Sequence, residues 1–239
     1  MKRIFLSTLI LLGLLLPVYS SDYGVYSPNN YNYSDEGEER TLFILDFSNS
    51  MSEFLDEQSK ADMMLDTMKK LLMSINPKSF IGLRVYGHRM GFTPFDSCRA
   101  SSLLVPITTS NSGAIAAALS QTHPRGMTPI TYSLKQAVKY DFMGFSGKKH
   151  IILLTDGGEN CDESPCKYVM ELIKVRKDVK IDVIAFNIRD EDDLDQLQCT
   201  SLVTGGKFYS ANTAAELANS LNNSANIRKE VEAKIIPHY

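Results

Sequence analysis

Three oxygen-bearing side chains, Asp46, Ser48 and Ser50, stand at alternate positions directly after an apolar run. That run, residues 42–45, shows no alternation of polar and apolar residues, which is typical of a strand buried on both faces in the middle of a parallel sheet. Asp46 then marks the end of the strand, and the two serines lie on the turn beyond it. A carboxylate and neutral hydroxyls that converge on one small volume are the ligands that a hard divalent cation such as Mg²⁺ prefers.

A second apolar strand, predicted over residues 150–154, also leads to an acid, Asp156. In open parallel sheets, ligands bind at the carboxyl ends of the strands. Asp46 and Asp156 are therefore expected to project from the same edge of the sheet, although they lie far apart in the chain. Each residue also has a plainer interpretation, because Asp46 could cap the following turn and Asp156 with Gly157 could form a simple turn out of the strand.

The wider pattern, from residue 41 onward, alternates strands with helices. Strands are predicted over residues 42–45, 80–86, 103–107, 150–154, 181–186 and 207–209, and helices over residues 64–75, 112–119, 130–138, 165–173, 192–203 and from 213 onward. The prediction is an α/β fold with a doubly wound, mostly parallel central sheet flanked by helices on both faces. The strand over 103–107 is expected to be a short edge strand, because Pro106 cannot donate a hydrogen bond to a ladder.

The beginning of the chain has the pattern of an export signal. Two basic residues precede a mostly apolar run over 4–16, and small residues suit a cleavage site near Ser20. We predict a signal peptide over 1–20, a disordered acidic linker rich in Asn and Tyr over 21–38, a folded domain over 39–223 and a C-terminal helical extension over 224–239. An uncleaved anchor is the alternative, but about 13 apolar residues fall short of the roughly 20 that span a bilayer. The protein is therefore expected to be secreted or periplasmic, with no stable membrane span after cleavage.

The charge balance bears on the kind of partner. The chain has 25 Lys and Arg against 28 Asp and Glu, and cleavage would remove Lys2 and Arg3 and no acid, which makes the mature chain more acidic. An acidic chain argues against a nucleic-acid partner. The signatures G-x-S-x-G, G-x₄-G-K and H-E-x-x-H are also missing from the sequence, so it gives no indication of the corresponding catalytic or phosphate-binding sites.

Four cysteines, Cys98, Cys161, Cys166 and Cys199, follow the predicted signal. An even number in an exported chain predicts disulfides, for which three pairings exist. We expect Cys161 to pair with Cys166 because the loop between them is local, which leaves Cys98 for Cys199. A zinc site is the competing interpretation, since Cys161 and Cys166 are spaced C-x₄-C, but no close histidine completes a finger-like set.

Three motifs together resemble a known family: Asp46-x-Ser48-x-Ser50, Gly126-x-Thr128-Pro129 and Thr155-Asp156-Gly157. They are similar to the metal-ion-dependent adhesion site (MIDAS) of von Willebrand factor type A (vWA) domains, which have a Rossmann-like fold. The resemblance covers about residues 39–223, and the three motifs in this order are far more specific than the first alone. Further segments, with the four cysteines in or beside them, resemble an exported bacterial branch of the family: 86–89, 103–106, 159–166 and 196–199.

The resemblance implies a bound Mg²⁺, with Mn²⁺ or Ca²⁺ as alternatives. Ser48 and Ser50 would hold the ion directly, Thr128 directly or through water, and Asp46 and Asp156 mainly through water. The ion would then accept one more oxygen from an acidic residue of a protein partner. The site is thus expected to bind and not to catalyse, and no catalytic residue is predicted. Phe47 and Asn49 stand where small residues are commoner in the family, but no ligand is missing.

Other interpretations remain open from the sequence. The domain could be a metal-free structural vWA scaffold in an envelope assembly. A Mg²⁺-dependent phosphatase-like hydrolase with Asp46 as nucleophile is a weaker alternative, because Ser48 stands where such enzymes are expected to carry a second acid.

Two further groups of polar residues have no settled role. Glu159, Asp162 and Glu163 could form a second cation site, although a solvated acidic loop is the plainer interpretation. His88 and Arg89, at another strand end, could frame the partner surface or bond to neighbouring loops, and we favour the loops.

Overall fold

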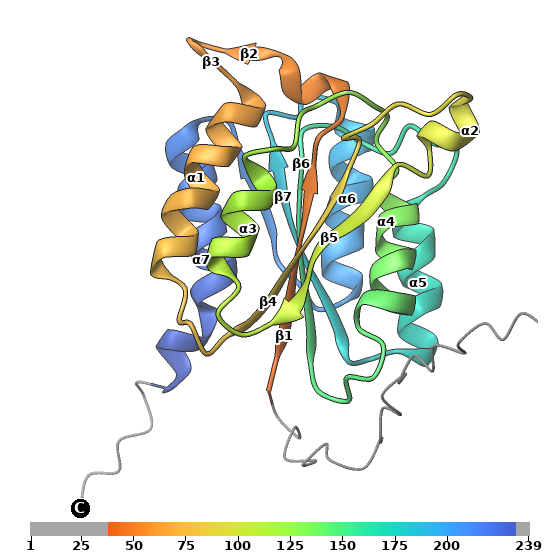
Figure 1. Ribbon diagram of the computed structural model, residues 1–239. Coiled ribbons are helices and arrows are strands. Elements are labelled where there is room, and N and C mark those ends of the chain that lie inside the picture. The colour runs from red at the N-terminus through yellow and green to blue at the C-terminus, as the bar shows by residue number, and fades with distance from the viewer. Residues whose placement is uncertain (1–37, 233–239) are drawn as a thin grey trace, which may run out of the picture. The chain divides into compact units, whose positions relative to one another are not determined.

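The computed structural model describes the backbone of residues 38–232 and the side chains of residues 38–225. These residues form three layers, a twisted sheet between two layers of helices (Figure 1). The predicted signal peptide, nearly all of the predicted linker and the last residues of the predicted C-terminal extension lie outside the described residues.

The central sheet has six strands in the order β5-β4-β1-β6-β7-β8. Their bounds are β1 Arg40–Asp46, β4 Phe80–Tyr86, β5 Ser101–Thr108, β6 Lys149–Thr155, β7 Val179–Phe186 and β8 Phe208–Ala211. All neighbours pair in parallel except β5, which is antiparallel to β4. The predicted fold class is confirmed, and the strand that contains Pro106 does lie at an edge, although β5 has 8 residues and is longer than expected.

Helices cover both faces of the sheet (Figure 1). On one face lie α1 Lys60–Ser74, α3 Ser112–Leu119 and α7 Ala214–Glu232, and on the other α4 Ile130–Gln136, α5 Pro165–Val175 and α6 Glu191–Val203. Strand β1 contributes side chains to the hydrophobic core on each face of the sheet. Phe43 and Leu45 pack on the first face, and Leu42 and Ile44 pack on the second. All four of these side chains are fully buried, as expected for a central parallel strand.

Several short elements were not predicted, and they lie at the carboxyl end of the sheet. They are the 3₁₀ turn η2 Asn49–Ser52, the hairpin strands β2 Phe54–Leu55 and β3 Gln58–Ser59, and the one-turn helix α2 Pro94–Ser97. A π-helical turn, η3 Ala137–Asp141, also continues α4. These elements are too short to show a hydrophobic period, so local hydrogen bonds and packing set them instead. In α2, for example, Thr93 and Asp96 form a reciprocal capping box.

Two disulfides are formed, and they use all four cysteines. Cys98 pairs with Cys161 and Cys166 with Cys199, with Cα–Cα distances of 5.5 and 5.4 Å. The prediction of disulfides is confirmed, but the expected local pairing of Cys161 with Cys166 is wrong, and so is that of Cys98 with Cys199. Cys166 lies in the first turn of α5, which packs against the α6 helix that carries Cys199. Such bonds fit an extracellular or secreted protein.

Helix α7 runs without a break from Ala214 to Glu232, so the predicted domain boundary at residue 223 falls inside a helix. Ser224, just beyond that boundary, is buried and donates a hydrogen bond of 2.7 Å to Asp182 Oδ2. The start of the predicted extension therefore packs on the domain. Within the described part of the chain, every helix is too short or too polar to cross a bilayer.

Candidate metal site

The residues that follow β1 turn back on themselves at the carboxyl end of the sheet. Asp46 ends the strand, and its Oδ1 accepts a hydrogen bond of 2.6 Å from the backbone N–H of Ser48. The Ser48 and Ser50 hydroxyl oxygens lie 3.0 Å apart. One turn of chain thus gathers one carboxylate and two hydroxyls, as the sequence pattern predicts.

The neighbouring strand β6 brings the second acid to the same place. Ser50 Oγ donates to Asp156 Oδ1 at 2.7 Å, and Thr155 Oγ1 donates to Asp46 Oδ2 at 2.8 Å. This closeness follows from the parallel pairing of β1 with β6, which sets their carboxyl ends side by side. Asp46, Ser48, Ser50 and Asp156 form one hydrogen-bonded cluster. Asp46 is fully buried in it, and Asp156 is only 6% exposed.

The segment that leads to Thr128 is held against this cluster through pairing of the backbone. Gly126 forms an isolated parallel bridge with Ser48, and the N–H of Asn49 donates to the Gly126 carbonyl at 2.9 Å. The Thr128 N–H donates to Asn160 Oδ1 at 2.7 Å, and Thr128 is 4% exposed. The segment with Thr128 is therefore held between the turn after β1 and the loop after β6.

Two glycines make this close approach possible. A Cβ on Gly87, whose φ is +69°, would lie 2.5 Å from the Ser48 backbone nitrogen. A Cβ on Gly126 would lie 2.5 Å from the Arg89 carbonyl oxygen. Any side chain at either position would push the loops apart, because these neighbours are backbone atoms that cannot move aside locally.

The surroundings of Asp46 favour its protonated form. Burial, and after it the charge of Asp156, raise the pKa of Asp46 to about 7, although hydrogen bonds from Ser48 and Thr155 act to lower it. Two acids in a dry site repel each other when both are ionised. A bound cation would relieve this repulsion.

Lys60 is a member of the site that the sequence analysis missed. Its ammonium donates to Asp156 Oδ2 at 2.9 Å and to Glu53 Oε2 at 2.8 Å, and its side chain is only 7% exposed. Burial lowers the pKa of Lys60, but the hydrogen bonds to Glu53 and Asp156 outweigh it and raise that pKa above its usual value.

A sequence signal for Lys60 did exist. Ser59 caps α1 by accepting from the Asp62 N–H, which makes Lys60 the first helical residue. A cation there is disfavoured by the helix dipole, so a lysine at that position indicates a specific partner.

The donor chemistry fits a small, hard divalent ion. The side chains of the cluster offer oxygen only, from two carboxylates and neighbouring hydroxyls, which suits Mg²⁺, Mn²⁺ or Ca²⁺ better than a soft metal. Among the described residues, no group of three or more His, Cys, Asp or Glu side chains could hold a metal ion. Any cation at this site would therefore depend on serine and threonine hydroxyls for part of its coordination.

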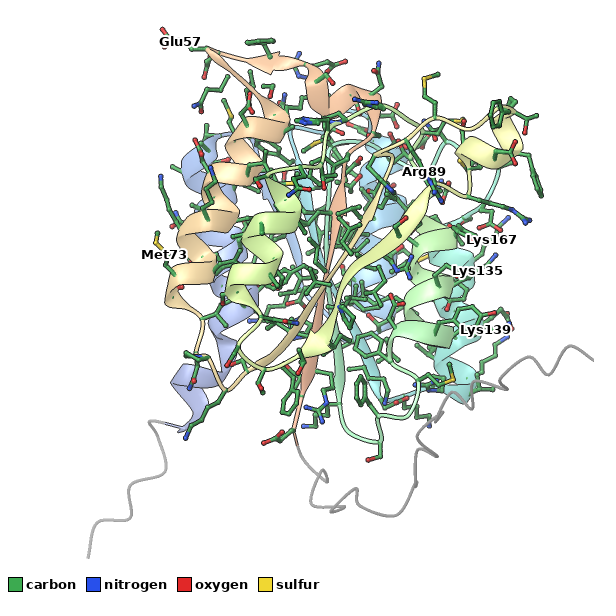
Figure 2. All side chains as sticks on the ribbon, viewed as in Figure 1. Glu57, Met73, Arg89, Lys135, Lys139 and Lys167 are labelled. Carbon is green, nitrogen blue, oxygen red and sulfur yellow. A yellow bond between two sulfur atoms is a disulfide. The ribbon has the colours of Figure 1, made fainter. Side chains whose placement is uncertain are left out.

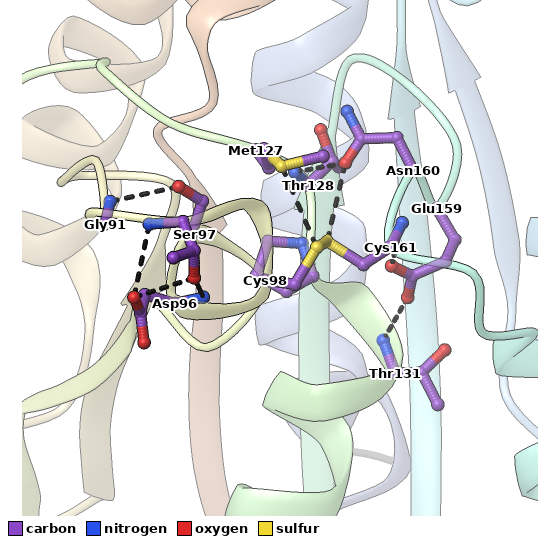
Figure 3. The surroundings of a disulfide bond; sticks show 12 residues. Gly91, Asp96, Ser97, Cys98, Met127, Thr128, Thr131, Glu159, Asn160 and Cys161 are labelled. Atoms are coloured by element: carbon purple, nitrogen blue, oxygen red, sulfur yellow. Dashed lines mark hydrogen bonds between the residues drawn. A yellow bond between two sulfur atoms is a disulfide. The ribbon is translucent and has the colours of Figure 1, made fainter.

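The disulfide between Cys98 and Cys161 lies beside Thr128 (Figure 3). Cys98 Sγ is 3.7 Å from the Met127 sulfur, and Asn160, which accepts from Thr128, directly precedes Cys161. The bond thus fastens the loop after β6 to the loop between β4 and β5, at the point where Thr128 is held.

The acidic loop after Asp156 has a structural use. Glu159 accepts hydrogen bonds from the N–H groups of Thr131 and Cys161 through its two carboxylate oxygens, at 2.7 and 3.1 Å. Glu163 binds Lys135 at 2.6 Å. These bonds account for two of the three acids that could have formed a second cation site.

Comparison with known proteins agrees with this geometry. Residues 41–159 match the family model of the von Willebrand factor type A domain. The chain therefore contains a vWA domain. An uncharacterised protein of Bacillus subtilis, YwmC, is 28% identical over 225 residues, which cover 91% of this chain and 94% of YwmC.

Solved structures show the same fold. Proximal thread matrix protein 1 from the mussel byssus, in a form with a zinc-occupied MIDAS motif, aligns with a TM-score of 0.60 and 19% identity over 81% of this chain. The pilus adhesin SpaC from Lactobacillus rhamnosus GG, in an open conformation, aligns with a TM-score of 0.62 and 17% identity over 80% of this chain. This chain spans only 46% and 30% of those two proteins.

Proposed function

We propose that this protein is an exported vWA domain that binds a divalent cation and uses it to capture an acidic residue of a protein partner, without catalysis. The observation that carries the proposal is the largely buried cluster of Asp46, Ser48, Ser50 and Asp156. Hydrogen bonds link the Ser48 N–H to Asp46, the two serine hydroxyls to each other and the Ser50 hydroxyl to Asp156. Thr128 completes the proposed ligand set from the adjoining loop. The cation would be Mg²⁺, with Mn²⁺ or Ca²⁺ as alternatives.

The roles of these residues follow from their charge and position. Ser48 and Ser50 would hold the ion directly, Thr128 directly or through water, and Asp46 and Asp156 mainly through water. When bound, the ion supplies a positive centre that accepts one further oxygen ligand. Hydroxyls donate weakly and Lys60 already neutralises part of Asp156, so the site would hold a cation without saturating its charge. A carboxylate from a partner would balance that remaining charge.

Asp46 is poorly suited to act as a nucleophile. Both of its carboxylate oxygens accept hydrogen bonds, from the Ser48 N–H and the Thr155 hydroxyl, and the residue is fully buried. A nucleophile must present an oxygen to its substrate, and the fully buried Asp46 has no exposed surface with which to do so. This geometry favours binding over the phosphatase-like alternative.

Export is part of the proposal. The signal-peptide pattern over residues 1–20 and the two disulfides both favour a secreted or periplasmic protein. The pilus adhesin SpaC is one protein of similar fold, and the occurrence of this fold in an adhesin supports the proposal that the domain binds a partner.

Calorimetric titration with Mg²⁺, Mn²⁺ and Ca²⁺ tests the first half of the proposal. We expect heat and thermal stabilisation from at least one ion. Both effects should be lost in Thr128→Val and in Ser50→Ala, and Ser52→Ala is the matched control, because Ser52 is an exposed serine of the same turn.

Affinity capture from envelope extract, in Mg²⁺ and in chelator, tests the second half of the proposal. Equal capture under the two conditions would count against a metal-mediated contact.

A second candidate, a metal-free structural scaffold, is favoured by one observation. The buried ammonium of Lys60 already gives Asp156 a cationic partner within the chain. If no ion produces heat or stabilisation in the titration, this candidate replaces the first.

A further inference from the structure

The loop between β4 and β5 exposes a cluster of apolar side chains. Ten large apolar residues are exposed among the described residues, and three of them, Met90, Phe92 and Phe95, lie within six consecutive positions. Their relative exposures are 75%, 106% and 62%. Apolar side chains gathered in this way mark an interaction surface more often than the same residues scattered singly.

The loop is braced, so these side chains are presented on a fixed support. The Gly91 N–H donates to Ser97 Oγ at 3.0 Å, Thr93 and Asp96 form the capping box of α2, and Cys98 is bonded to Cys161 (Figure 3). A preformed surface loses little conformational entropy when it binds.

Arginines add positive charge to the same loop. Arg89 and Arg99 are both exposed, and the Arg99 guanidinium lies 3.8 Å from the centre of the Phe95 ring. Arg125, also exposed, belongs to the segment that leads to Thr128. We call Arg89, Met90, Phe92, Phe95 and Arg99 the arginine–aromatic patch.

The patch adjoins the candidate metal site on the Thr128 side. The Arg89 carbonyl oxygen packs against Gly126, and the disulfide of Cys98 lies beside Met127 and Asn160. Figure 2 shows Arg89 toward the same end of the sheet as Glu57, which marks the tip of the β2–β3 hairpin, while Met73 lies far along α1.

The opposite rim of the site has the opposite charge. The hairpin and the turn before it expose Glu53, Asp56 and Glu57, and in Figure 1 this hairpin and α2 stand on opposite sides of the carboxyl end of β1. An acidic partner is therefore repelled on the hairpin side and attracted on the patch side.

A hollow of about 460 Å³ lies beside His88, the residue that directly precedes Arg89 of the patch. His88 and Arg125 line it together with Leu104, Ala118 and His123, so it combines apolar walls with cationic and imidazole groups. Such a recess suits a side chain that carries an acid on an apolar stem.

We propose that the arginine–aromatic patch is the second half of the partner-binding surface, and that the partner is an acidic protein segment with aromatic or aliphatic side chains beside its metal-bound carboxylate. This inference rests on the proposed function, because the carboxylate is what places the segment at the rim. The metal would bind the carboxylate of the partner, and the patch would distinguish between partners by the side chains beside that carboxylate.

Fluorescence anisotropy with synthetic peptides tests the proposal, in Mg²⁺ and in EDTA. Each peptide has one central Asp in a Gly/Ser background. The first adds Phe, Leu and a second Asp beside it, the second adds Lys at the same positions, and the third adds nothing. We expect the first peptide to bind the wild-type protein about tenfold more tightly than the third, and the second more weakly than the third.

The double variant Phe92→Ser/Phe95→Ser should bring the first and third peptides to within about twofold of each other, while the binding of the third peptide stays unchanged. Met73→Ser is the matched control, because Met73 is 81% exposed on α1 and should leave both affinities unchanged. Arg99→Gln should weaken the first peptide more than the third. Thermal melts of all the variants check that they remain folded.

The outcomes separate the inference from the proposed function. If the wild-type protein binds no peptide more tightly in Mg²⁺ than in EDTA, both fail. If binding depends on Mg²⁺ but the first peptide has no advantage, or keeps its advantage in the double variant, only the patch inference fails. The wild-type protein could instead self-associate in Mg²⁺, and the double variant could fail to do so. That result would show that a second copy of this chain occupies the patch, and the proposal of a different acidic protein as the partner would be wrong.

Discussion

The substitution Lys60→Met tests the electrostatics of the site most directly. The ammonium lies 2.9 Å from Asp156 Oδ2 and 2.8 Å from Glu53 Oε2, and only 7% of the Lys60 side chain is exposed. Methionine keeps an unbranched apolar stem but removes the charge. Asp156, whose side chain is fully buried, then loses its cationic partner.

The expected loss in the free energy of unfolding follows from the exposed fractions of these side chains. Removal of one partner from a buried ion pair typically costs about 3–5 kcal/mol, because the remaining charge stays buried without compensation. The contact with Glu53 contributes little, since 66% of the Glu53 side chain is exposed. We expect the free energy of unfolding in chelator to fall by about 3 kcal/mol, the lower end of that range.

A bound cation should reverse much of this loss. Mg²⁺ at one hundred times its Kd stabilises a folded protein by about 2.7 kcal/mol. The ion no longer shares Asp156 with an ammonium in the variant, so Mg²⁺ should bind about tenfold more tightly and add a further ~1.4 kcal/mol at the same ion concentration. The variant should therefore be about 3 kcal/mol less stable than the wild type in chelator, and only about 1.6 kcal/mol less stable than the wild type in Mg²⁺.

Urea unfolding of wild type and variant, each in EDTA and in saturating Mg²⁺, measures both effects. Lys69→Met is the control, because Lys69 lies on the same helix with 59% of its side chain exposed and should change stability little. If Lys60→Met costs under about 1 kcal/mol in EDTA and responds to Mg²⁺ like the wild type, the assigned role of Lys60 is refuted.

Three further predictions follow from the same geometry. Burial and the charge of Asp156 hold the pKa of Asp46 at about 7, above its usual value, so a proton must leave when a cation binds. Calorimetry should therefore show that Mg²⁺ binds about tenfold more tightly at pH 8 than at pH 6. The metal-free protein should lose stability as the pH rises from about 4 to 7, because in this range its folded state binds a proton that the unfolded state has released. Arg84 forms a two-pronged ion pair with Asp141 at 2.6 and 2.7 Å in the interior, so Arg84→Met should cost about 3–5 kcal/mol in urea unfolding, and a loss below about 1 kcal/mol would contradict the pairing. Peptide mapping of the unreduced protein should recover Cys98 linked to Cys161 and Cys166 linked to Cys199. The double variant Cys98→Ser/Cys161→Ser should weaken Mg²⁺ binding more than Cys166→Ser/Cys199→Ser does, since only the first disulfide lies beside Thr128.

The sequence alone was sufficient to predict the fold class and the convergence of the candidate ligands. Apolar runs such as residues 42–45 predicted strands buried on both faces, and the helices between them required a parallel sheet. Parallel strands share one carboxyl edge, so Asp46 and Asp156 had to lie near each other whatever the details of packing. Pro106 likewise predicted that its strand lies at an edge of the sheet, because a single proline cannot donate a hydrogen bond to a neighbouring strand.

Tertiary structure alone decided the features that depend on distances between elements. The pairing of Cys98 with Cys161 could not follow from spacing, since it depends on where two loops from different strands meet. The contact of Lys60 with Asp156 arises because α1 begins beside the end of β6. The arginine–aromatic patch, too, exists only because a capping box and a disulfide fix a loop that has no periodic pattern of its own. A periodic pattern reports which face of an element is buried, but only packing determines which side chains from distant elements come within bonding distance.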